Sequence, residues 1–205
     1  MHIGIAGNIG SGKTTLTRML SEHYGWTPKY ESVKYNPYLE DYYKDIKRWS
    51  FNLEIYFLEQ RFQDVLDIAK SKETIIQDRT IFEGVYIFVE NNRAMGNLSE
   101  RDFATYMALF KEMMSLVRPP DLLIYLKSGI PHLVEQIGKR GRAYEQGISL
   151  EYLKGLNERY DSWIASYEGR VLAIETDELD FENNKEDFAR ITEKIDAELY
   201  GLFSH

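Results

Sequence analysis

The feature that most constrains the fold is a glycine-rich turn between a short apolar segment and a helical one. All eight positions of the phosphate-binding pattern G-x-x-x-x-G-K-[ST] are matched by Gly7-Asn8-Ile9-Gly10-Ser11-Gly12-Lys13-Thr14. Residues 2–6 have the apolar character of a buried strand, and Leu16, Met19 and Leu20 share one face of the helix that follows. Strand, loop and helix in this order are the context that the motif requires, and they predict an α/β fold.

The chemistry of this loop predicts a ligand. Its glycines let consecutive backbone N–H groups turn inward around an anion, and the helix N-terminus adds a partial positive charge. We expect Lys13 to reach the outer phosphates and the Thr14 hydroxyl to hold Mg²⁺. The loop and Thr15, which follows it, are therefore predicted to bind a nucleoside triphosphate together with Mg²⁺.

Composition narrows the class of protein. A chain of 205 residues with 43% hydrophobic content suits one α/β domain over residues 1–205. The net charge of −8 argues against a nucleic-acid polymer as partner, because such proteins need a broad basic face. The absence of cysteine excludes disulfides and thiolate metal sites. Because we find no secretory leader pattern and no apolar run of membrane-spanning length, we expect a cytoplasmic location and no membrane partner.

Short apolar runs alternate with longer helical segments along the whole chain. This alternation predicts a parallel sheet with helices on both faces. We expect strands at 2–6, 27–31, 74–78, 121–126 and 171–175, all but the second buried on both faces. Helices are expected at 13–24, 36–70 with a break near 44–47, 82–92, 99–117, 130–139, 149–167 and 184–203.

Charged residues stand at the ends of two expected strands. Asp78 and Arg79 close the third strand, and Glu31 closes the second. In an open parallel sheet ligands bind just beyond these carboxyl ends. Asp78 is suited to hold Mg²⁺ and Arg79 to offset phosphoryl charge, although the pair could also be a solvated ion pair at a helix start. Glu31, with no obvious cationic neighbours beyond Lys29 and Lys34, is suited to accept a proton from a substrate hydroxyl.

A cationic segment follows the helix expected at 130–139. Lys139, Arg140 and Arg142 surround Gly141 and lead into residues 143–147. These cations predict a short lid that closes over the triphosphate and stabilises its charge. A cationic helix C-terminus stabilised by the helix dipole is the alternative, and the two are compatible.

These motifs occur in an order that resembles the deoxyribonucleoside kinase family, which includes the deoxycytidine, deoxyguanosine and deoxyadenosine kinases, and its bacterial branch in particular. Besides the phosphate loop, the resemblance rests on Glu31-Ser32-Val33, Asn36-Pro37-Tyr38-Leu39, Arg48-Trp49-Ser50-Phe51, Asp78-Arg79-Thr80, Arg140-Gly141-Arg142 and Glu145-Gln146-Gly147-Ile148. It implies a P-loop kinase fold, a five-stranded parallel sheet flanked by helices with a short arginine-bearing lid. It also implies transfer of the ATP γ-phosphoryl group to a deoxynucleoside 5′-hydroxyl, and a homodimer formed through a helix bundle.

The resemblance implies a role for each matching residue. Glu31 would be the general base, and Arg79 would steer both it and the 5′-hydroxyl. Asp78 and Thr14 would bind Mg²⁺. The γ-phosphoryl group would be stabilised by Lys13, Arg140 and Arg142. The deoxynucleoside would contact Glu31, Tyr43, Glu54, Arg79, Gly84, Phe88 and Glu145, with Tyr43 and Glu145 on the sugar 3′-hydroxyl, and the donor adenine would lie at Asp180 and Phe181.

The chain departs from the family pattern in four places. Glu54 replaces a glutamine that contacts the base, Gly84 replaces a base-reading aspartate, Gln136 replaces a lid arginine, and Ser32 replaces a proline. A carboxylate at position 54 accepts N–H groups but donates none, which favours a base with an amino group. We expect deoxyadenosine first, with deoxyguanosine and deoxycytidine open; guanine matches an ionised Glu54 best, and thymine matches it worst.

Two other functions are compatible with a phosphate loop. A nucleoside monophosphate kinase such as thymidylate kinase would need extra arginines around a dianionic acceptor. The acceptor side instead holds mainly acidic residues and Tyr43, with Arg48 the nearest cation in sequence. A nucleotide-dependent switch protein would be expected to carry an Asn-Lys-x-Asp motif, and the sequence has none.

Overall fold

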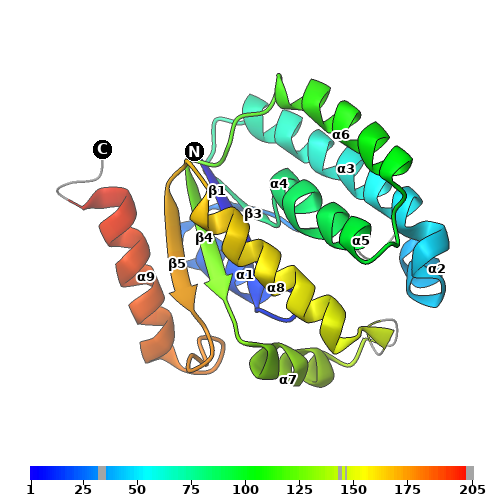
Figure 1. Cartoon of the computed structure of the whole chain (residues 1–205). Coiled ribbons are helices and arrows are strands. Elements are labelled where there is room, and N and C mark those ends of the chain that lie inside the picture. Colours follow the sequence, from blue (N-terminus) through cyan, green and yellow to red (C-terminus); the bar gives the residue numbers. More distant parts are fainter. Residues whose placement is uncertain (32–35, 143–144, 146, 202–205) are drawn as a thin grey trace.

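Five parallel strands form one sheet at the centre of the molecule (Figure 1). The computed structural model describes residues 1–31, 36–142, 145 and 147–201. The spatial order of the strands is β2-β3-β1-β4-β5. Their bounds are His2–Gly7 for β1, Thr27–Lys29 for β2, Ile75–Asp78 for β3, Leu122–Lys127 for β4 and Val171–Glu175 for β5. The five expected strands and their parallel arrangement are confirmed, although β2 ends two residues earlier than expected.

Burial differs between the centre and the edge of this sheet. Strands β1 and β3 are buried throughout, and β4 is buried except at its last residue. The expectation that the fifth strand is buried on both faces is wrong, because only Ile174 of β5 is fully buried. Its position at the edge of the sheet explains this, since a strand there has a neighbour on one side only.

Helices connect the strands and cover both faces of the sheet (Figure 1). They are α1 (Lys13–Tyr24), α2 (Leu39–Lys44), α3 (Ile46–Lys70), α4 (Ile81–Glu83), α5 (Glu90–Ala94), α6 (Glu100–Met114), α7 (Ile130–Arg140), α8 (Leu150–Ala165) and α9 (Lys185–Tyr200), with a π-helix, η1, at Gly84–Val89. The break expected near 44–47 falls at Asp45, whose side chain accepts a hydrogen bond from the Arg48 backbone N–H and starts α3.

The segment expected to be one helix over 82–92 is divided into α4, η1 and α5. The π-helical turn is not visible in a hydrophobic pattern, because it depends on local packing rather than on the spacing of apolar residues. At its first residue, a Cβ on Gly84 would lie 2.9 Å from Arg61 Nη1 and 3.2 Å from the Tyr106 hydroxyl. A glycine is therefore what lets this turn approach the side chains of α3 and α6 so closely.

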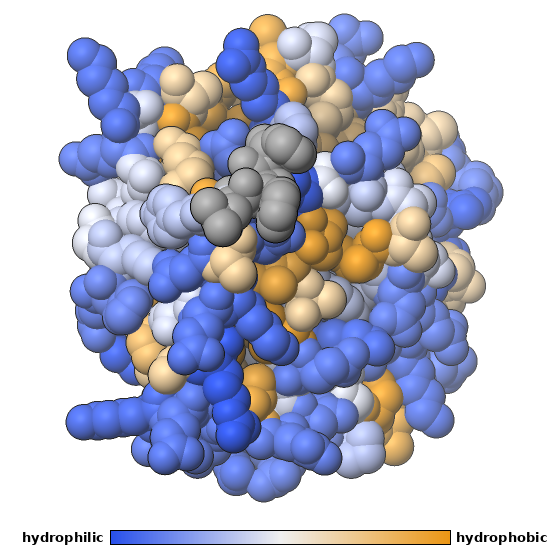
Figure 2. Space-filling view, turned by 90° about the vertical axis from the view of Figure 1, so that its left-hand side faces the viewer, coloured by the Kyte–Doolittle hydropathy of each residue, from blue (hydrophilic) through white to orange (hydrophobic). Residues whose placement is uncertain are grey.

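Alternating residues of β4 supply two separate cores. Leu122, Ile124 and Leu126 pack with residues of α1 and α9 on one face. Leu123 and Tyr125 pack on the other face with residues of α3, η1, α6 and α8. Figure 2 shows the side on which α9 lies, where hydrophilic residues cover most of the surface, as expected for a helix with one buried face. No helix among the described residues is long and apolar enough to cross a membrane.

Candidate active site

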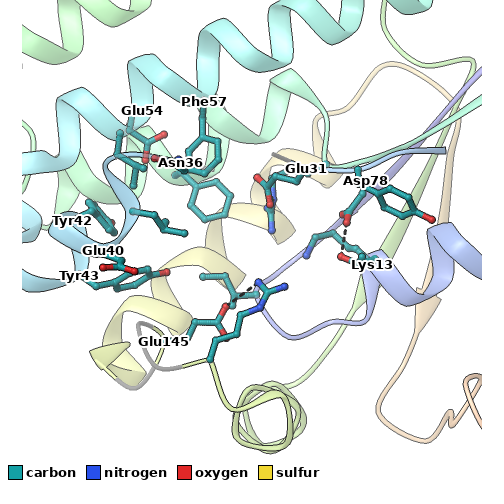
Figure 3. A pocket seen from close by; sticks show the side chains of 18 of the residues that line it. Lys13, Glu31, Asn36, Glu40, Tyr42, Tyr43, Glu54, Phe57, Asp78 and Glu145 are labelled. Carbon is teal, nitrogen blue, oxygen red and sulfur yellow. Dashed lines mark hydrogen bonds and ion pairs between the residues drawn. The ribbon is translucent and has the colours of Figure 1, made fainter. Parts of the chain in front are cut away.

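A cavity of about 560 Å³ opens beyond the carboxyl ends of β1 and β3 (Figure 3). Side chains from distant parts of the chain line it. They include Lys13, Thr14, Glu31, Glu40, Tyr42, Tyr43, Glu54, Phe57, Arg61, Asp78, Arg79, Phe88, Arg140, Arg142, Glu145 and Tyr152. The cavity thus brings together the phosphate loop and nearly all the residues predicted for the acceptor.

Glu31 lies two residues beyond the end of β2 and points toward two guanidinium groups. Arg61 Nη2 is 2.5 Å from Glu31 Oε1, and Arg79 Nε is 3.2 Å from the same oxygen. The expectation that Glu31 has no cationic neighbours beyond Lys29 and Lys34 is therefore wrong. Lys29 instead contacts Asp64 and Asp67 of α3, at 2.9 and 3.0 Å, and Lys34 lies outside the described residues.

The two arginines determine the ionisation of Glu31. Burial on its own raises the pKa of this carboxyl group, but the positive charges of Arg79 and Arg61 outweigh it and lower the pKa to about 2. Glu31 is therefore ionised throughout the physiological pH range. It offers acceptor oxygens to a hydroxyl group placed in the cavity.

Arg79 is held by a buried network behind the cavity. It has a φ of 69°, the only positive φ of a non-glycine residue in the described chain. Its Nη1 donates to the Tyr160 hydroxyl oxygen at 2.8 Å and to Glu83 Oε1 at 3.3 Å. Glu83 also accepts from the Tyr160 hydroxyl and from the Thr80 backbone N–H, each at 2.7 Å. These contacts offset a backbone conformation that costs on the order of 1–3 kcal/mol.

The donor side begins at the phosphate loop. The Lys13 ammonium group donates to the Asn8 carbonyl oxygen at 2.7 Å. Burial, reinforced by the charge of Arg79, lowers the pKa of Lys13 to about 7. Incoming phosphates would favour the charged form of this side chain, which is thus suited to an anionic ligand.

Thr14 and Asp78 provide oxygen atoms that fit Mg²⁺. The Thr14 hydroxyl donates to Asp78 Oδ2 at 2.5 Å, while Asp78 Oδ1 is buried and has no hydrogen-bond partner within the described part of the chain. Such oxygen atoms are the ligands that Mg²⁺ prefers. No group of three or more His, Cys, Asp or Glu residues in the described parts of the chain forms a metal site. The remaining ligands of an ion here would be phosphate oxygens and water, as is usual for Mg²⁺ in phosphoryl transfer.

A second cavity, of about 750 Å³, lies on the other side of the phosphate loop. Its lining includes Gly12, Gln136 and Asp180. Phe181 packs against the loop, because a Cβ on Gly12 would lie only 2.8 Å from its ring. The residues predicted for the donor adenine therefore lie beside the phosphate loop, as a donor site requires.

Arg140 and Arg142 line both cavities. In this structure Glu145 pairs with both: Arg140 Nη2 is 2.5 Å and Arg142 Nη1 is 3.5 Å from Glu145 Oε1. The two arginines and the residue predicted for the sugar thus form one ionic cluster. It stands where the two cavities meet.

The end of the first cavity that lies away from the phosphate loop contains Glu54. Its Oε1 accepts a 3.0 Å hydrogen bond from Asn92 Nδ2. Burial raises the pKa of this carboxyl group to about 7, against the opposing charge of Arg61. Gly84 is the one residue predicted for the nucleoside that does not line the cavity, since Arg61 fills the space beside it.

Some residues that line or support this site were not predicted for it from the sequence, among them Arg61, Glu83, Asn92 and Tyr160. For Glu83 a signal was available, because the spacing T-x-x-E at Thr80 is typical of a helix N-terminus. Arg48, the nearest cation in sequence, instead lies over the Trp49 ring at 4.5 Å. The motif residues Ser32, Val33 and Gln146 lie outside the described residues.

The sequence is similar to a family of known enzymes along almost its whole length. The sequence model described as "Deoxynucleoside kinase" matches residues 3–200. A deoxyadenosine/deoxycytidine kinase of Bacillus subtilis is 37% identical over 196 residues, 94% of this chain and 90% of the relative. A deoxyguanosine kinase of the same organism is 37% identical over 202 residues, 94% and 95% of the two chains.

Solved structures show the same similarity in three dimensions. A deoxyadenosine kinase from M. mycoides with bound dATP superimposes with a TM-score of 0.85 at 33% sequence identity, covering 96% of this chain and all of the other. A structure of that kinase with dCTP bound gives a TM-score of 0.85 at 30% identity, over 96% and 100% of the two chains. This chain, with its five-stranded parallel sheet, therefore has the P-loop kinase fold. The chain therefore belongs to the deoxynucleoside kinase family.

Proposed function

We propose that the protein transfers the γ-phosphoryl group of ATP to the 5′-hydroxyl of a deoxyribonucleoside, with Mg²⁺, in nucleotide salvage. The observation that carries this proposal is the position of Glu31 in one cavity with Lys13 and Thr14 of the phosphate loop. An ionised acceptor for a hydroxyl proton thus stands within the same space as the groups that bind phosphate. A phosphoryl transfer needs this arrangement, because positioning and charge stabilisation supply most of its catalysis.

On the acceptor side, Glu31 accepts a hydrogen bond from the 5′-hydroxyl and orients its oxygen toward the phosphate. A carboxylate with a pKa of about 2 is a weak base. Such a base suffices when the bond to the leaving group is largely broken before the 5′-hydroxyl proton is removed, as in a loose phosphoryl-transfer transition state. Arg79, anchored by Glu83 and Tyr160, keeps Glu31 ionised and directs it into the cavity.

On the donor side, the loop N–H groups and Lys13 hold the phosphates. Thr14 and Asp78 would bind Mg²⁺, which supplies charge neutralisation across the phosphates when it is present. Arg140 and Arg142 border both cavities and so can reach the transferring group. Their positive charges would stabilise the negative charge that spreads over the phosphoryl oxygens.

The sugar would lie between the transfer site and the base. Tyr43 and Glu145 line this part of the cavity, and we assign them to the 3′-hydroxyl. Phe88 and Phe57 supply aromatic surface for the base, and Glu54 supplies a hydrogen-bond acceptor. Deoxyadenosine is the favoured substrate, with deoxyguanosine and deoxycytidine as the other candidates. The named activities of the relatives include all three nucleosides.

The test is an assay of ADP release with each deoxynucleoside and with thymidine monophosphate as acceptors. Turnover of one or more deoxynucleosides supports the proposal. Turnover of the monophosphate alone would replace it with a nucleoside monophosphate kinase. The acceptor cavity opposes a dianion, because Glu31, Glu54 and Glu145 line it and both Arg61 and Arg79 already pair with Glu31.

We further propose that two copies associate through a helix bundle, as the family resemblance implies, and we assign the contact to α6. A shallow groove on this helix is lined in part by Ala104, Ala108 and Leu109. Leu109 is 44% exposed, and alanines four residues apart permit close approach of a second helix. Sedimentation equilibrium of the protein and of Ala108→Arg tests this proposal. A dimer that the substitution dissociates supports it, and a monomer at micromolar concentration would contradict it.

A further inference from the structure

The position of Glu54 suggests that its side chain does more than accept hydrogen bonds from a base. Its side chain comes from α3, is 3% exposed, and points into the end of the cavity (Figure 3). Asn92 Nδ2 donates to Oε1, and the orientation of that amide is set because the Tyr42 hydroxyl donates to Asn92 Oδ1 at 3.1 Å. Among the described residues, Oε2 has no hydrogen-bond partner. Oε2 is therefore available to a base, and Oε1 keeps a second lone pair with which it can accept from the base beside it.

The Asn92 contact also places the proton when Glu54 is neutral. An oxygen that accepts a hydrogen bond from an amide N–H cannot direct its own O–H toward the same group. The carbonyl oxygen of a neutral carboxyl group is its better acceptor, so this hydrogen bond favours Oε1 as the carbonyl oxygen and Oε2 as the oxygen that carries the proton. The O–H then points away from Asn92 and into the cavity.

Charged and titratable groups face Glu54 from every element packed around it. They are Arg61 on α3, Glu31 and Arg79 beyond β2 and β3, and the tyrosines Tyr42, Tyr106 and Tyr152 on α2, α6 and α8. Arg79 stays positive and Glu31 stays ionised at physiological pH. Burial raises the pKa of all three tyrosines, so they stay neutral.

Glu54 differs from these neighbours. Burial raises the pKa of its carboxyl group to about 7, and its most influential cation, Arg61, is already paired with Glu31. In this part of the cavity, the charge of Glu54 thus changes in the pH range where its neighbours stay constant. The two forms of the side chain offer different hydrogen bonds to a base.

Neutral Glu54 presents an O–H donor beside an acceptor oxygen. Adenine and cytosine present the complementary pair on one edge, an amino group beside an unprotonated ring nitrogen. Ionised Glu54 presents two acceptors, which complement guanine, whose ring N–H adjoins its amino group. Each mismatched combination sets two acceptors or two donors against each other, and buried mismatches of this kind cost affinity strongly.

We propose that the protonation state of Glu54 selects the base: the neutral form takes deoxyadenosine or deoxycytidine, and the ionised form takes deoxyguanosine. This inference rests on the proposed phosphorylation of deoxynucleosides. It adds that the substrate preference of one unmodified pocket changes with pH. Asn92 acts as the positioning residue that keeps the titrating oxygen directed at the base.

The experiment is a competition between deoxyadenosine and deoxyguanosine in one reaction, from pH 6 to 8.5. The ratio of the two monophosphates gives the ratio of their kcat/KM values. Groups that act on both substrates, including Lys13 with its pKa of about 7, cancel in this ratio. We expect the ratio of deoxyadenosine to deoxyguanosine turnover to fall with rising pH, by up to about tenfold per pH unit around the titration midpoint.

Two variants test whether Glu54 causes the pH dependence. Glu54→Gln cannot ionise, so its product ratio should be independent of pH and favour deoxyadenosine. Glu59→Gln makes the same change at an exposed position of α3 and should keep the pH dependence. A ratio in the unmodified protein that is flat with pH, or turnover of deoxyadenosine alone at every pH, would overturn the inference. Absence of turnover on every deoxynucleoside would instead contradict the proposed function.

Discussion

Arg61 Nη2 lies 2.5 Å from Glu31 Oε1, although the two residues are thirty positions apart in the sequence. Arg61 belongs to α3, whereas Glu31 lies two residues beyond the end of β2. The Arg61 side chain is 6% exposed, and its Nε has no hydrogen-bond partner among the described residues. This contact places a positive charge beside Glu31, the proposed general base. It also links the end of the cavity proposed for the nucleobase to the end proposed for phosphoryl transfer.

Replacement of Glu31, the proposed general base, tests the reaction directly. Glu31→Gln keeps the size of the side chain and removes the negative charge that accepts the hydroxyl proton. We expect kcat to fall by about 10²–10⁴-fold, with ATP affinity measured by calorimetry nearly unchanged. The matched control is Glu73→Gln, at an exposed glutamate near the opposite end of β3. Near-normal kcat in the Glu31 variant would remove this residue from the mechanism.

The proposed metal ligands can be separated from general effects on folding. Thr14→Ser keeps the hydroxyl that donates to Asp78, whereas Thr14→Val removes it. We expect the valine variant, and Asp78→Asn, to raise the Mg²⁺ concentration for half-maximal activity about tenfold or more. The serine variant should stay close to the unmodified protein. If activity in all three variants responds to Mg²⁺ as before, these residues do not bind the ion.

Two glycines with the same backbone conformation should respond differently to substitution. Gly12 and Gly25 have φ values of 88° and 70°. A Cβ at Gly12 meets the Phe181 ring at 2.8 Å, while a Cβ at Gly25 has nothing within 4 Å. Gly25→Ala should cost about 1–2 kcal/mol of stability from backbone strain alone and leave ATP affinity unchanged. Gly12→Ala should also displace Phe181 and weaken ATP binding about tenfold or more. Equal ATP affinity in the two variants would contradict the role of this packing.

The carboxyl group of Glu54 makes stability depend on pH. Its pKa rises from 4.5 in the unfolded chain to about 7 in the folded one. The folded state therefore holds a proton that the unfolded state releases, so this contribution is complete below about pH 4.5 and is lost as pH rises through 7. The free energy of unfolding relative to Glu54→Gln should fall by up to about 3 kcal/mol between pH 5 and 8. Urea unfolding at several pH values measures it, and a constant difference would show that Glu54 does not titrate there.

Much of the fold could be predicted from local patterns. The apolar runs of β1, β3 and β4 correctly predicted buried strands. The bounds of α1 agree with the expected helix 13–24. The edge position of β5 and the π-helical turn at Gly84–Val89 could not be predicted. Both depend on which neighbours an element packs against, and a hydrophobic pattern does not contain that information.

The residues of the candidate site could likewise be predicted only in part from the sequence. The residues in short motifs, such as Lys13, Asp78 and Arg79, were predicted because their chemistry is specified by adjacent residues. Asn92 and Tyr160 were not, because each acts through a hydrogen bond to a residue far away in the sequence. Such a contact requires the helices to be in place before the side chains can meet.

The sequence by itself determined the phosphate loop, the α/β class and the kind of chemistry that the strand ends can support. These follow from contiguous residues, where backbone geometry and side-chain type act over a few positions. Only the tertiary structure decided that Glu31 is paired with two arginines and that Glu54 is buried beside Asn92. Burial and neighbouring charges set the pKa of each carboxyl group, and both are properties of packing rather than of order along the chain.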